Sequence, residues 1–258
     1  MSPLHSIIEG QGPVIVLSHA LGCDLHMWDE VAARLVDRYT VVRYDQRGHG
    51  RSPASAGAFG MQELAQDAAQ LIAQLGRGPV HFAGVSMGGM TAQALAALHP
   101  EAVQSITIAN SAARYDAAAQ QGWQTRIDTV RAQGVAVIAD GALQRWLSPD
   151  FMAQHPQRVA QMREALVRIA PEPYAQACAA VAGIALDASN PSIRCPALVM
   201  AGTLDFATPM AMSQEIAAGI AGAELVTIDA AHISCVEQPE VFVRLLDGFI
   251  QRAWNRSP

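Results

Sequence analysis

Two kinds of hydrophobic pattern alternate along the chain. Short continuous apolar runs, such as VIVLS at 14–18, are typical of strands buried on both faces of a sheet. Longer segments with apolar residues three or four positions apart are typical of helices that bury one face. The first pattern predicts strands at 14–18, 39–45, 79–85, 103–110, 196–202 and 223–229. The second predicts helices at 26–36, 63–75, 87–98, 208–218 and 239–253.

The alternation is interrupted between residues 112 and 190, which carry no convincing strand pattern. Four amphipathic helices are predicted there, and their apolar faces carry Trp123, Ile127 and Val130; Val135, Ile138, Ala142 and Trp146; Val159, Met162, Leu166 and Ile169; and Tyr174, Cys178, Val181 and Ile184. Elsewhere the strands need right-handed crossover helices, which cover both faces of a mostly parallel sheet. We therefore predict an α/β core of residues 1–111 and 191–258, with a helical cap of residues 112–190 folded over its carboxyl edge.

The segment GVSMG at 84–88 stands between a predicted strand and a predicted helix. A bare G-x-S-x-G pattern is common by chance, but this strand–turn–helix setting is the one in which it forms a nucleophile elbow. The glycines leave room for a strained turn that lifts the serine above the sheet. The N-terminus of the helix adds N–H donors beside it. We therefore predict that Ser86 is a nucleophile; the alternative is a glycine-rich packing turn.

A serine hydroxyl is a weak nucleophile and needs a base. His232 follows the last predicted strand and precedes the last helix, so it lies at the same carboxyl edge of the sheet as Ser86. Asp205 follows the strand at 196–202 and shares that edge. Its carboxylate could fix the tautomer of the base and stabilise its charged form. The chain order serine, aspartate, histidine is that of one large architecture of serine hydrolases.

An oxyanion formed at the reacting carbonyl needs hydrogen-bond donors. The N–H of Met87 follows the nucleophile directly, and the N–H of Leu21 lies in the loop after the first predicted strand. We predict that these two groups form the oxyanion hole, in which each donor lowers the barrier by roughly 3–4 kcal/mol. Gly22 allows the loop to turn.

Composition narrows the class of protein and its partners. Hydrophobic residues make up 51% of the chain and charged residues only 16%, which is typical of a compact globular protein. The net charge is −6, and no long run of Lys or Arg occurs, so neither nucleic acid nor an anionic membrane surface is an expected partner. No apolar stretch approaches the roughly 20 residues that a membrane-spanning helix needs.

Cysteine and histidine spacing bears on location and on metals. The four cysteines are scattered without a C-x-x-C pair, and the N-terminus lacks the basic-then-apolar pattern of an export signal. We therefore expect free thiols in a reducing cytoplasm. Neither H-E-x-x-H nor another clustered arrangement of metal ligands occurs, so no metal site is predicted.

Together these features resemble the α/β-hydrolase superfamily over nearly the whole chain. The segment YDQRGHGRS at 44–52 looks like an element that braces the active-site loops in that superfamily, which implies structural roles for Asp45 and Arg47. A narrower resemblance is to the 3-oxoadipate enol-lactonase family. The segments that carry it are LSHALGCDLHMWD, VVRYDQRGHGRS, GVSMGGMTAQ, IANSAAR, WQTRIDTVRAQG, LQRWLSPDF and AAHISCVEQPE. The cap segments weigh most, because hydrolases of this fold diverge in the cap.

The narrower resemblance implies hydrolysis of an anionic enol-lactone in bacterial catabolism of protocatechuate and catechol, with no cofactor. A protein of net charge −6 does not attract an anion at long range, so a local cation should pair with the substrate carboxylate. Arg126 and Arg145 in the cap are the candidates, and Trp123 and Trp146 are candidate pocket walls. The alternative for each arginine is a solvated surface position, and for each tryptophan a core position.

Two departures from the family pattern lie beside the predicted site. His19-Ala20 stand where the family has Asn-Ser, and Cys235 stands where it has Asn. Because they leave the triad intact but alter its surroundings, a carboxylesterase, or a lactonase for a neutral or xenobiotic lactone, is the second hypothesis. A non-catalytic binding protein with the same fold is the third, since a fold alone does not establish activity.

Overall fold

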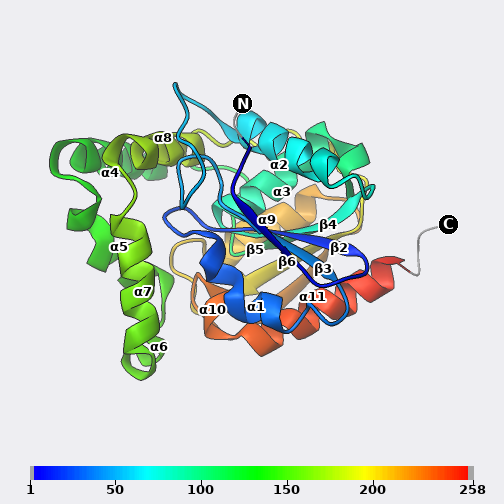
Figure 1. The fold of residues 1–258 in the computed structure, drawn as a ribbon. Coiled ribbons are helices and arrows are strands. Elements are labelled where there is room, and N and C mark those ends of the chain that lie inside the picture. The colour runs from blue at the N-terminus through cyan, green and yellow to red at the C-terminus, as the bar shows by residue number, and fades with distance from the viewer. Residues whose placement is uncertain (1–2, 255–258) are drawn as a thin grey trace.

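A seven-stranded sheet forms the centre of the computed structural model, which describes residues 3–254 (Figure 1). The strand order is β1-β3-β2-β4-β5-β6-β7, and all neighbouring pairs from β3 to β7 are parallel. The strands are β1 (Ser6–Glu9), β2 (Val14–Ser18), β3 (Thr40–Tyr44), β4 (Val80–Val85), β5 (Val103–Ala109), β6 (Ala197–Gly202) and β7 (Glu224–Ile228). All six predicted strands are present, which confirms the mostly parallel sheet.

The edge strand β1 is an addition to the predicted sheet, which begins at residue 14. It pairs antiparallel with β3, so that Ser6 lies opposite Tyr44. No residue of β1 is buried, and Ile8 is 54% exposed. A short strand at the open edge lacks the continuous apolar run of a strand covered on both faces, and the sequence pattern therefore misses it.

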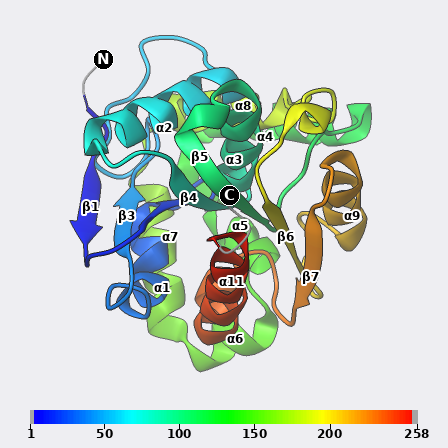
Figure 2. The ribbon, with the colours of Figure 1, turned by 90° about the vertical axis from the view of Figure 1, so that its right-hand side faces the viewer.

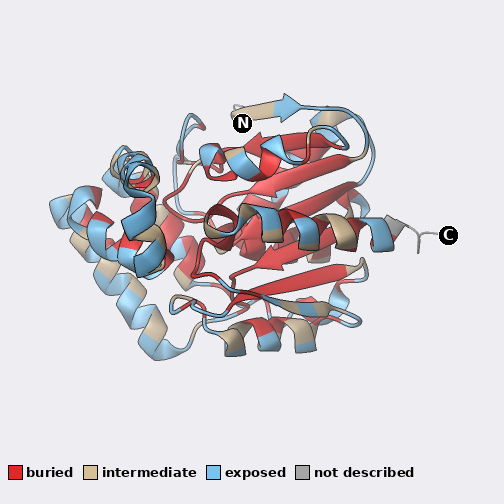
Figure 3. Ribbon diagram, turned by 90° about the horizontal axis from the view of Figure 1, so that it is seen from below, coloured by how far each residue is buried: buried red, intermediate tan, exposed pale blue. Residues whose placement is uncertain are grey.

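Helices cover both faces of the sheet, with α2 and α3 on one side and α1 and α11 on the other (Figures 1 and 2). Every residue of β2, β3, β4 and β6 is buried between these layers (Figure 3). The core helices are α1 (Asp29–Ala33), α2 (Met61–Leu75), α3 (Met87–Leu98), α9 (Met210–Gly219), α10 (Ser234–Glu237) and α11 (Pro239–Trp254). The helix predicted at 26–36 is in fact a 3₁₀ helix, η1 (Leu25–Trp28), followed by the short α1. Two further 3₁₀ turns are η2 (Pro100–Ala102) and η4 (Asn190–Ser192).

The insert between β5 and β6 is helical, as predicted, but is divided more finely. Its elements are α4 (Ala117–Gln133), the 3₁₀ helix η3 (Val135–Ile138), α5 (Ala139–Trp146), α6 (Pro149–Gln154), α7 (Pro156–Val167) and α8 (Pro171–Ala182). The short α6 was not predicted: prolines at the first positions of α6 and α7 start two helices on either side of His155. A single bridge between Arg114 and Ala185 joins the two ends of the insert.

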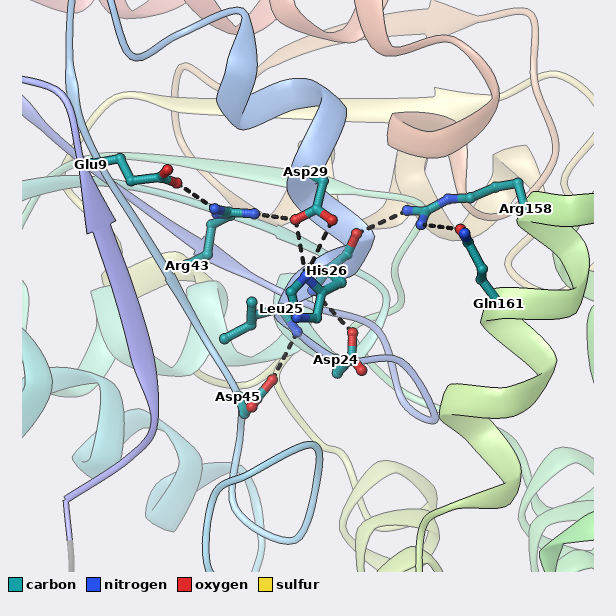
Figure 4. Close-up of polar contacts among 9 residues, drawn as sticks. All are labelled: Glu9, Asp24, Leu25, His26, Asp29, Arg43, Asp45, Arg158 and Gln161. Carbon is teal, nitrogen blue, oxygen red and sulfur yellow. Dashed lines mark hydrogen bonds and ion pairs between the residues drawn. The ribbon is translucent and has the colours of Figure 1, made fainter.

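The cap is fastened to the core through α7. The Arg158 guanidinium donates to the main-chain carbonyl of His26 in η1 at 2.8 Å (Figure 4). Asp29, which directly follows η1, pairs with Arg43 of β3, and Arg43 also pairs with Glu9 of β1 (Figure 4). These ion pairs hold η1 against the sheet. The carboxyl ends of the parallel strands face the cap, so the loops after them lie between the sheet and the cap (Figure 1). No helix among residues 3–254 is both long and apolar enough to cross a bilayer.

Candidate active site

Ser86 forms the turn between β4 and α3. Its backbone has φ 56° and ψ −115°, a conformation that non-glycine residues rarely adopt and that costs roughly 1–3 kcal/mol. Two glycines make the turn possible. A Cβ atom on Gly84 would lie 2.1 Å from the Gly88 carbonyl oxygen, and one on Gly88 would lie 2.1 Å from the Ser18 carbonyl oxygen. The strained serine persists because a buried strand and a buried helix fix the chain on both sides of it.

Asp205 and His232 lie in contact at the ends of β6 and β7. Asp205 Oδ2 is 2.9 Å from His232 Nδ1, and both side chains are buried. The same carboxylate accepts the N–H groups of Ala207 and Thr208, the Thr208 hydroxyl at 2.7 Å and the Asn110 amide at 3.0 Å. Burial alone would raise the pKa of Asp205, but the imidazole and these hydrogen bonds outweigh it and lower the pKa to about 2. Asp205 is therefore ionised throughout the neutral range.

Ser86 and His232 line one cavity of about 560 Å³, together with Leu21 and Thr208. Since the ionised Asp205 accepts from Nδ1, the tautomer of His232 that it favours leaves Nε2 as an acceptor for a nucleophile. The three predicted triad residues thus come from three separate strand ends to one place, where they can activate a hydroxyl.

The two predicted oxyanion donors come from two different segments of the chain. Leu21 lines the cavity, and Met87 is the first residue of α3. An N–H in the first turn of a helix has no acceptor within that helix, so the N–H of Met87 is free to serve a ligand. The Met87 side chain is only 1% exposed and lies in the core, which leaves the backbone as its contribution to the site.

Two buried histidines hold the loop that carries Leu21. His19 Nε2 accepts the N–H of Gln46 at 2.9 Å, and His49 Nε2 accepts the N–H of Gly22 at 3.2 Å. Burial lowers the pKa of His19 to about 4; burial and the neighbouring His19 lower that of His49 to about 3. Both rings are therefore neutral acceptors at neutral pH. Their role could not be assigned from the sequence, because it depends on two loops that meet only in the fold.

The outer wall of the cavity belongs to the cap. All four predicted contacts, Trp123, Arg126, Arg145 and Trp146, line it. The Arg126 guanidinium lies 5.6 Å from the centres of both the Trp123 and Tyr174 rings, and its buried Nε has no hydrogen-bond partner within residues 3–254. Neither arginine forms an ion pair with a carboxylate of the described residues. Two cationic groups are thus available to an anion in the cavity.

Several residues of the site were not predicted. Tyr115, Thr208 and Met212 also line the cavity. Asn110, after β5, has φ 48° and donates to both Asp205 and the Ala231 carbonyl. Asn110 could have been found by the strand-end rule that located Asp205 and His232, because it follows a buried strand at the same edge. The others lie in loops and helices whose approach to the site depends on tertiary packing.

The two departures from the family pattern do not reach the cavity surface. His19, Ala20 and Cys235 are buried and are absent from the described residues that line it. Asp45 and Arg47 are structural, as expected: Asp45 accepts the N–H groups of Leu25 and Arg51, and Arg47 pairs with Asp67. Within residues 3–254, no group of three or more His, Cys, Asp or Glu side chains could hold a metal ion.

The chain belongs to the α/β-hydrolase family: the family model described as alpha/beta hydrolase fold matches residues 13–239. The 3-oxoadipate enol-lactonase 2 of Acinetobacter baylyi is 36% identical over 244 residues, which cover 95% of this chain and 91% of that protein. The crystal structure of the enol-lactonase from Burkholderia xenovorans LB400 matches with a TM-score of 0.92 and 38% identity, over 96% of each chain. A thermophilic esterase from Thermogutta terrifontis matches with a TM-score of 0.91 and 28% identity, over 97% of this chain and 93% of that one. These comparisons confirm the resemblance to enol-lactonases.

Proposed function

We propose that this protein is a serine hydrolase that opens the ring of 3-oxoadipate enol-lactone in the catabolism of aromatic compounds. As an α/β hydrolase with enol-lactonase relatives, it acts on ester or lactone bonds. The observation that carries the finer proposal is the shared cavity, which Ser86 and His232 line together with two cap arginines that have no carboxylate partner in the described part of the chain. Hydrolysis of an anionic lactone requires a nucleophile, a base that activates it, and cations that bind the carboxylate of the substrate.

In the proposed reaction, Ser86 Oγ bonds to the lactone carbonyl carbon as its proton passes to His232 Nε2. The Leu21 and Met87 N–H groups hold the oxyanion. The ring C–O bond then breaks, and its electron pair leaves on the enol oxygen, which takes the proton from His232. An enolate leaves more readily than an alkoxide, so this step needs little help from the acid. Water next gives a proton to His232 and attacks the acyl carbon; the proton returns to Ser86 Oγ as the acid is released.

The test of the substrate is a panel of lactones and esters with product analysis. We expect 3-oxoadipate enol-lactone to react with kcat/KM above about 10⁴ M⁻¹s⁻¹ and faster than simple aryl esters. A lower value, with aryl esters as the better substrates, would favour the second hypothesis, a carboxylesterase or a lactonase for a neutral or xenobiotic lactone. The similarity to the Thermogutta terrifontis esterase supports that alternative.

The substrate carboxylate is proposed to bind Arg126 and Arg145, with Trp123 and Trp146 as walls. Replacing Arg126 by Ala should raise KM for an anionic lactone about 10- to 100-fold, since a hydrogen bond to a charged group contributes about 1.5–3 kcal/mol. Turnover of a neutral lactone should change little. Steady-state kinetics on both lactones measure this.

The matched control for Arg126 is Arg131→Ala on the same helix. Arg131 is exposed, pairs with Glu172 and does not line the cavity, so its loss should leave both KM values unchanged. Equal losses on the anionic and neutral lactones in Arg126→Ala would contradict a carboxylate-binding role.

The third hypothesis, a non-catalytic binding protein, is tested by covalent labelling. A fluorophosphonate should modify wild-type protein stoichiometrically at Ser86 and should not modify Ser86→Ala. We further propose that the enzyme works in the cytoplasm on a small molecule, without a cofactor. All four cysteines are free thiols, which fits a reducing compartment.

A further inference from the structure

The main chain on the N-terminal side of His232 is tied to the cap by one carboxylate. Glu237 Oε2 accepts the N–H of Ala231 at 3.0 Å, and Glu237 Oε1 accepts the N–H of Ser148 at 2.5 Å. Ala231 directly precedes His232, whereas Ser148 lies in the cap between α5 and α6. Glu237 thus joins the histidine loop to a cap residue, Ser148, that lies 89 positions before it in the sequence.

The C-terminal side of His232 is tied to the same cap segment. The N–H of Ile233 donates to the Trp146 carbonyl at 3.0 Å. The Trp146 side chain also lines the cavity. Its ring packs against Gly22 in the loop that carries Leu21, where a Cβ atom on Gly22 would lie 2.8 Å from Trp146 Cη2. Both neighbours of His232 are therefore linked to cap residues 146–148, and Trp146 of this segment also lines the cavity.

We propose that Glu237 is a positioning residue that couples the cap segment 146–148 to the imidazole of His232. The inference rests on the proposed role of His232 as the base. Asp205 fixes only Nδ1 of the ring, so the direction in which Nε2 points also depends on the main chain at 231–233. Two N–H donors face the two oxygens of Glu237, an arrangement that a carboxylate satisfies and an amide cannot, because its NH₂ group would face one donor. A displacement of the main chain at Ser148 is thereby passed to the loop that carries His232.

The first test removes one N–H group from the cap. Ser148 has φ −67° and ψ 149°, and Leu147 before it is extended, so the dihedral angles at 148 suit proline, whose Cδ atom would displace the Glu237 carboxylate. Ser148→Pro removes the N–H that Glu237 accepts. Ser148→Ala keeps that N–H and removes only the hydroxyl that accepts the N–H of Phe151. The difference between these two variants isolates the link.

We expect Ser148→Pro and Glu237→Gln to lower kcat about 10- to 100-fold with KM within about twofold, because a slightly misplaced base loses rate without losing substrate contacts. The rate of Ser86 labelling by a fluorophosphonate should fall by a similar factor. Ser148→Ala should keep both rates. Arg158→Gln, which loosens the cap at its contact with His26, should also keep them, since this contact does not touch the histidine loop.

Melting temperatures separate misplacement from unfolding, and all variants are assayed well below them. The inference is overturned if Ser148→Pro and Glu237→Gln label at the wild-type rate, or if Arg158→Gln slows labelling as much as they do. If wild-type protein is not labelled at Ser86, the proposed catalytic triad fails and this inference fails with it. If wild-type protein is labelled, and Ser148→Pro and Glu237→Gln are labelled at the same rate as wild type, the triad stands and this inference alone is wrong.

Discussion

Asn110 shows how one side chain can organise several parts of the site. Its amide donates to Asp205 and to the Ala231 carbonyl, and its oxygen accepts the Ser234 hydroxyl at 2.6 Å. Its φ of 48° is tolerated because asparagine adopts the left-handed region more readily than most residues. Asn110 thus orients both Asp205 and the loop that carries His232.

Asn110→Asp is a sharp test at this scale, because aspartate also tolerates a positive φ and keeps an acceptor for Ser234. The new carboxylate would face Asp205 where the amide donates now, so the free energy of unfolding should fall by about 1–3 kcal/mol at pH 7. Two adjacent carboxylates raise the pKa of one of them. On acidification the folded variant therefore binds a proton that its unfolded state does not yet bind. The difference in the free energy of unfolding between wild type and the variant should then be smaller at pH 5 than at pH 7.

Urea unfolding of both proteins at the two pH values measures this deficit. Ser234→Ala is the control, because it removes a hydrogen bond to Asn110 without adding a charge, and its deficit should not depend on pH. A deficit of Asn110→Asp that is the same at pH 7 and pH 5 would contradict the close approach of the two carboxylates.

At the scale of elements, the site depends on how closely β4, α3 and β2 approach one another. The helix at 87–98 was predicted with its observed bounds, because proline follows it and the serine turn precedes it. The strand β1 and the helix α6 were not predicted. β1 has only four residues, none of them buried, and α6 has only six residues. Such segments owe their conformation to neighbours more than to their own hydrophobic pattern.

Gly88→Ala should disturb this approach directly. Its Cβ would lie 2.1 Å from the Ser18 carbonyl oxygen, a backbone atom that cannot rotate away, so α3 must shift from β2. We expect a loss of about 3 kcal/mol in the free energy of unfolding, measured by urea denaturation. Gly141→Ala in α5 is the control: beyond the helix's own backbone, no atom of the described residues lies within 4 Å of the added Cβ, and alanine should stabilise the helix by about 0.5–1 kcal/mol. Equal effects of the two substitutions would refute the argument.

At the scale of the whole molecule, burial of histidines links stability to pH. Burial lowers the pKa of His81 in β4 to about 4, as it does for His19, and His49 lies lower still, at about 3. In the unfolded chain these rings take up protons below about pH 6.5, whereas the folded protein does not until about pH 4. The unfolded state therefore binds more protons in this window, and the free energy of unfolding should fall as pH drops from 6.5 to 4.

Replacement of His81 by Leu should reduce this slope by about 1.4 kcal/mol per pH unit, the contribution of one proton. The matched control is Ser105→Ala, which removes the hydroxyl 2.8 Å from His81 Nδ1 but keeps the titrating ring, so its slope should remain that of wild type. Denaturant unfolding between pH 6 and pH 4.5 gives the slopes. A wild-type slope in His81→Leu would show that this ring is not the proton acceptor.

The hydrophobic pattern by itself determined six strands, the cap insertion and the strand ends that carry Ser86, Asp205 and His232, because each of these depends on residues close together in sequence. Only the tertiary structure decided which groups meet across long separations. Examples are the hydrogen bonds from Asn110 to Asp205, from the Gly22 N–H to His49, and from the Ser148 N–H of the cap to Glu237. A hydrogen bond between distant loops leaves no periodic signal along the chain, since its geometry is set by the packing of the sheet and helices that carry the loops.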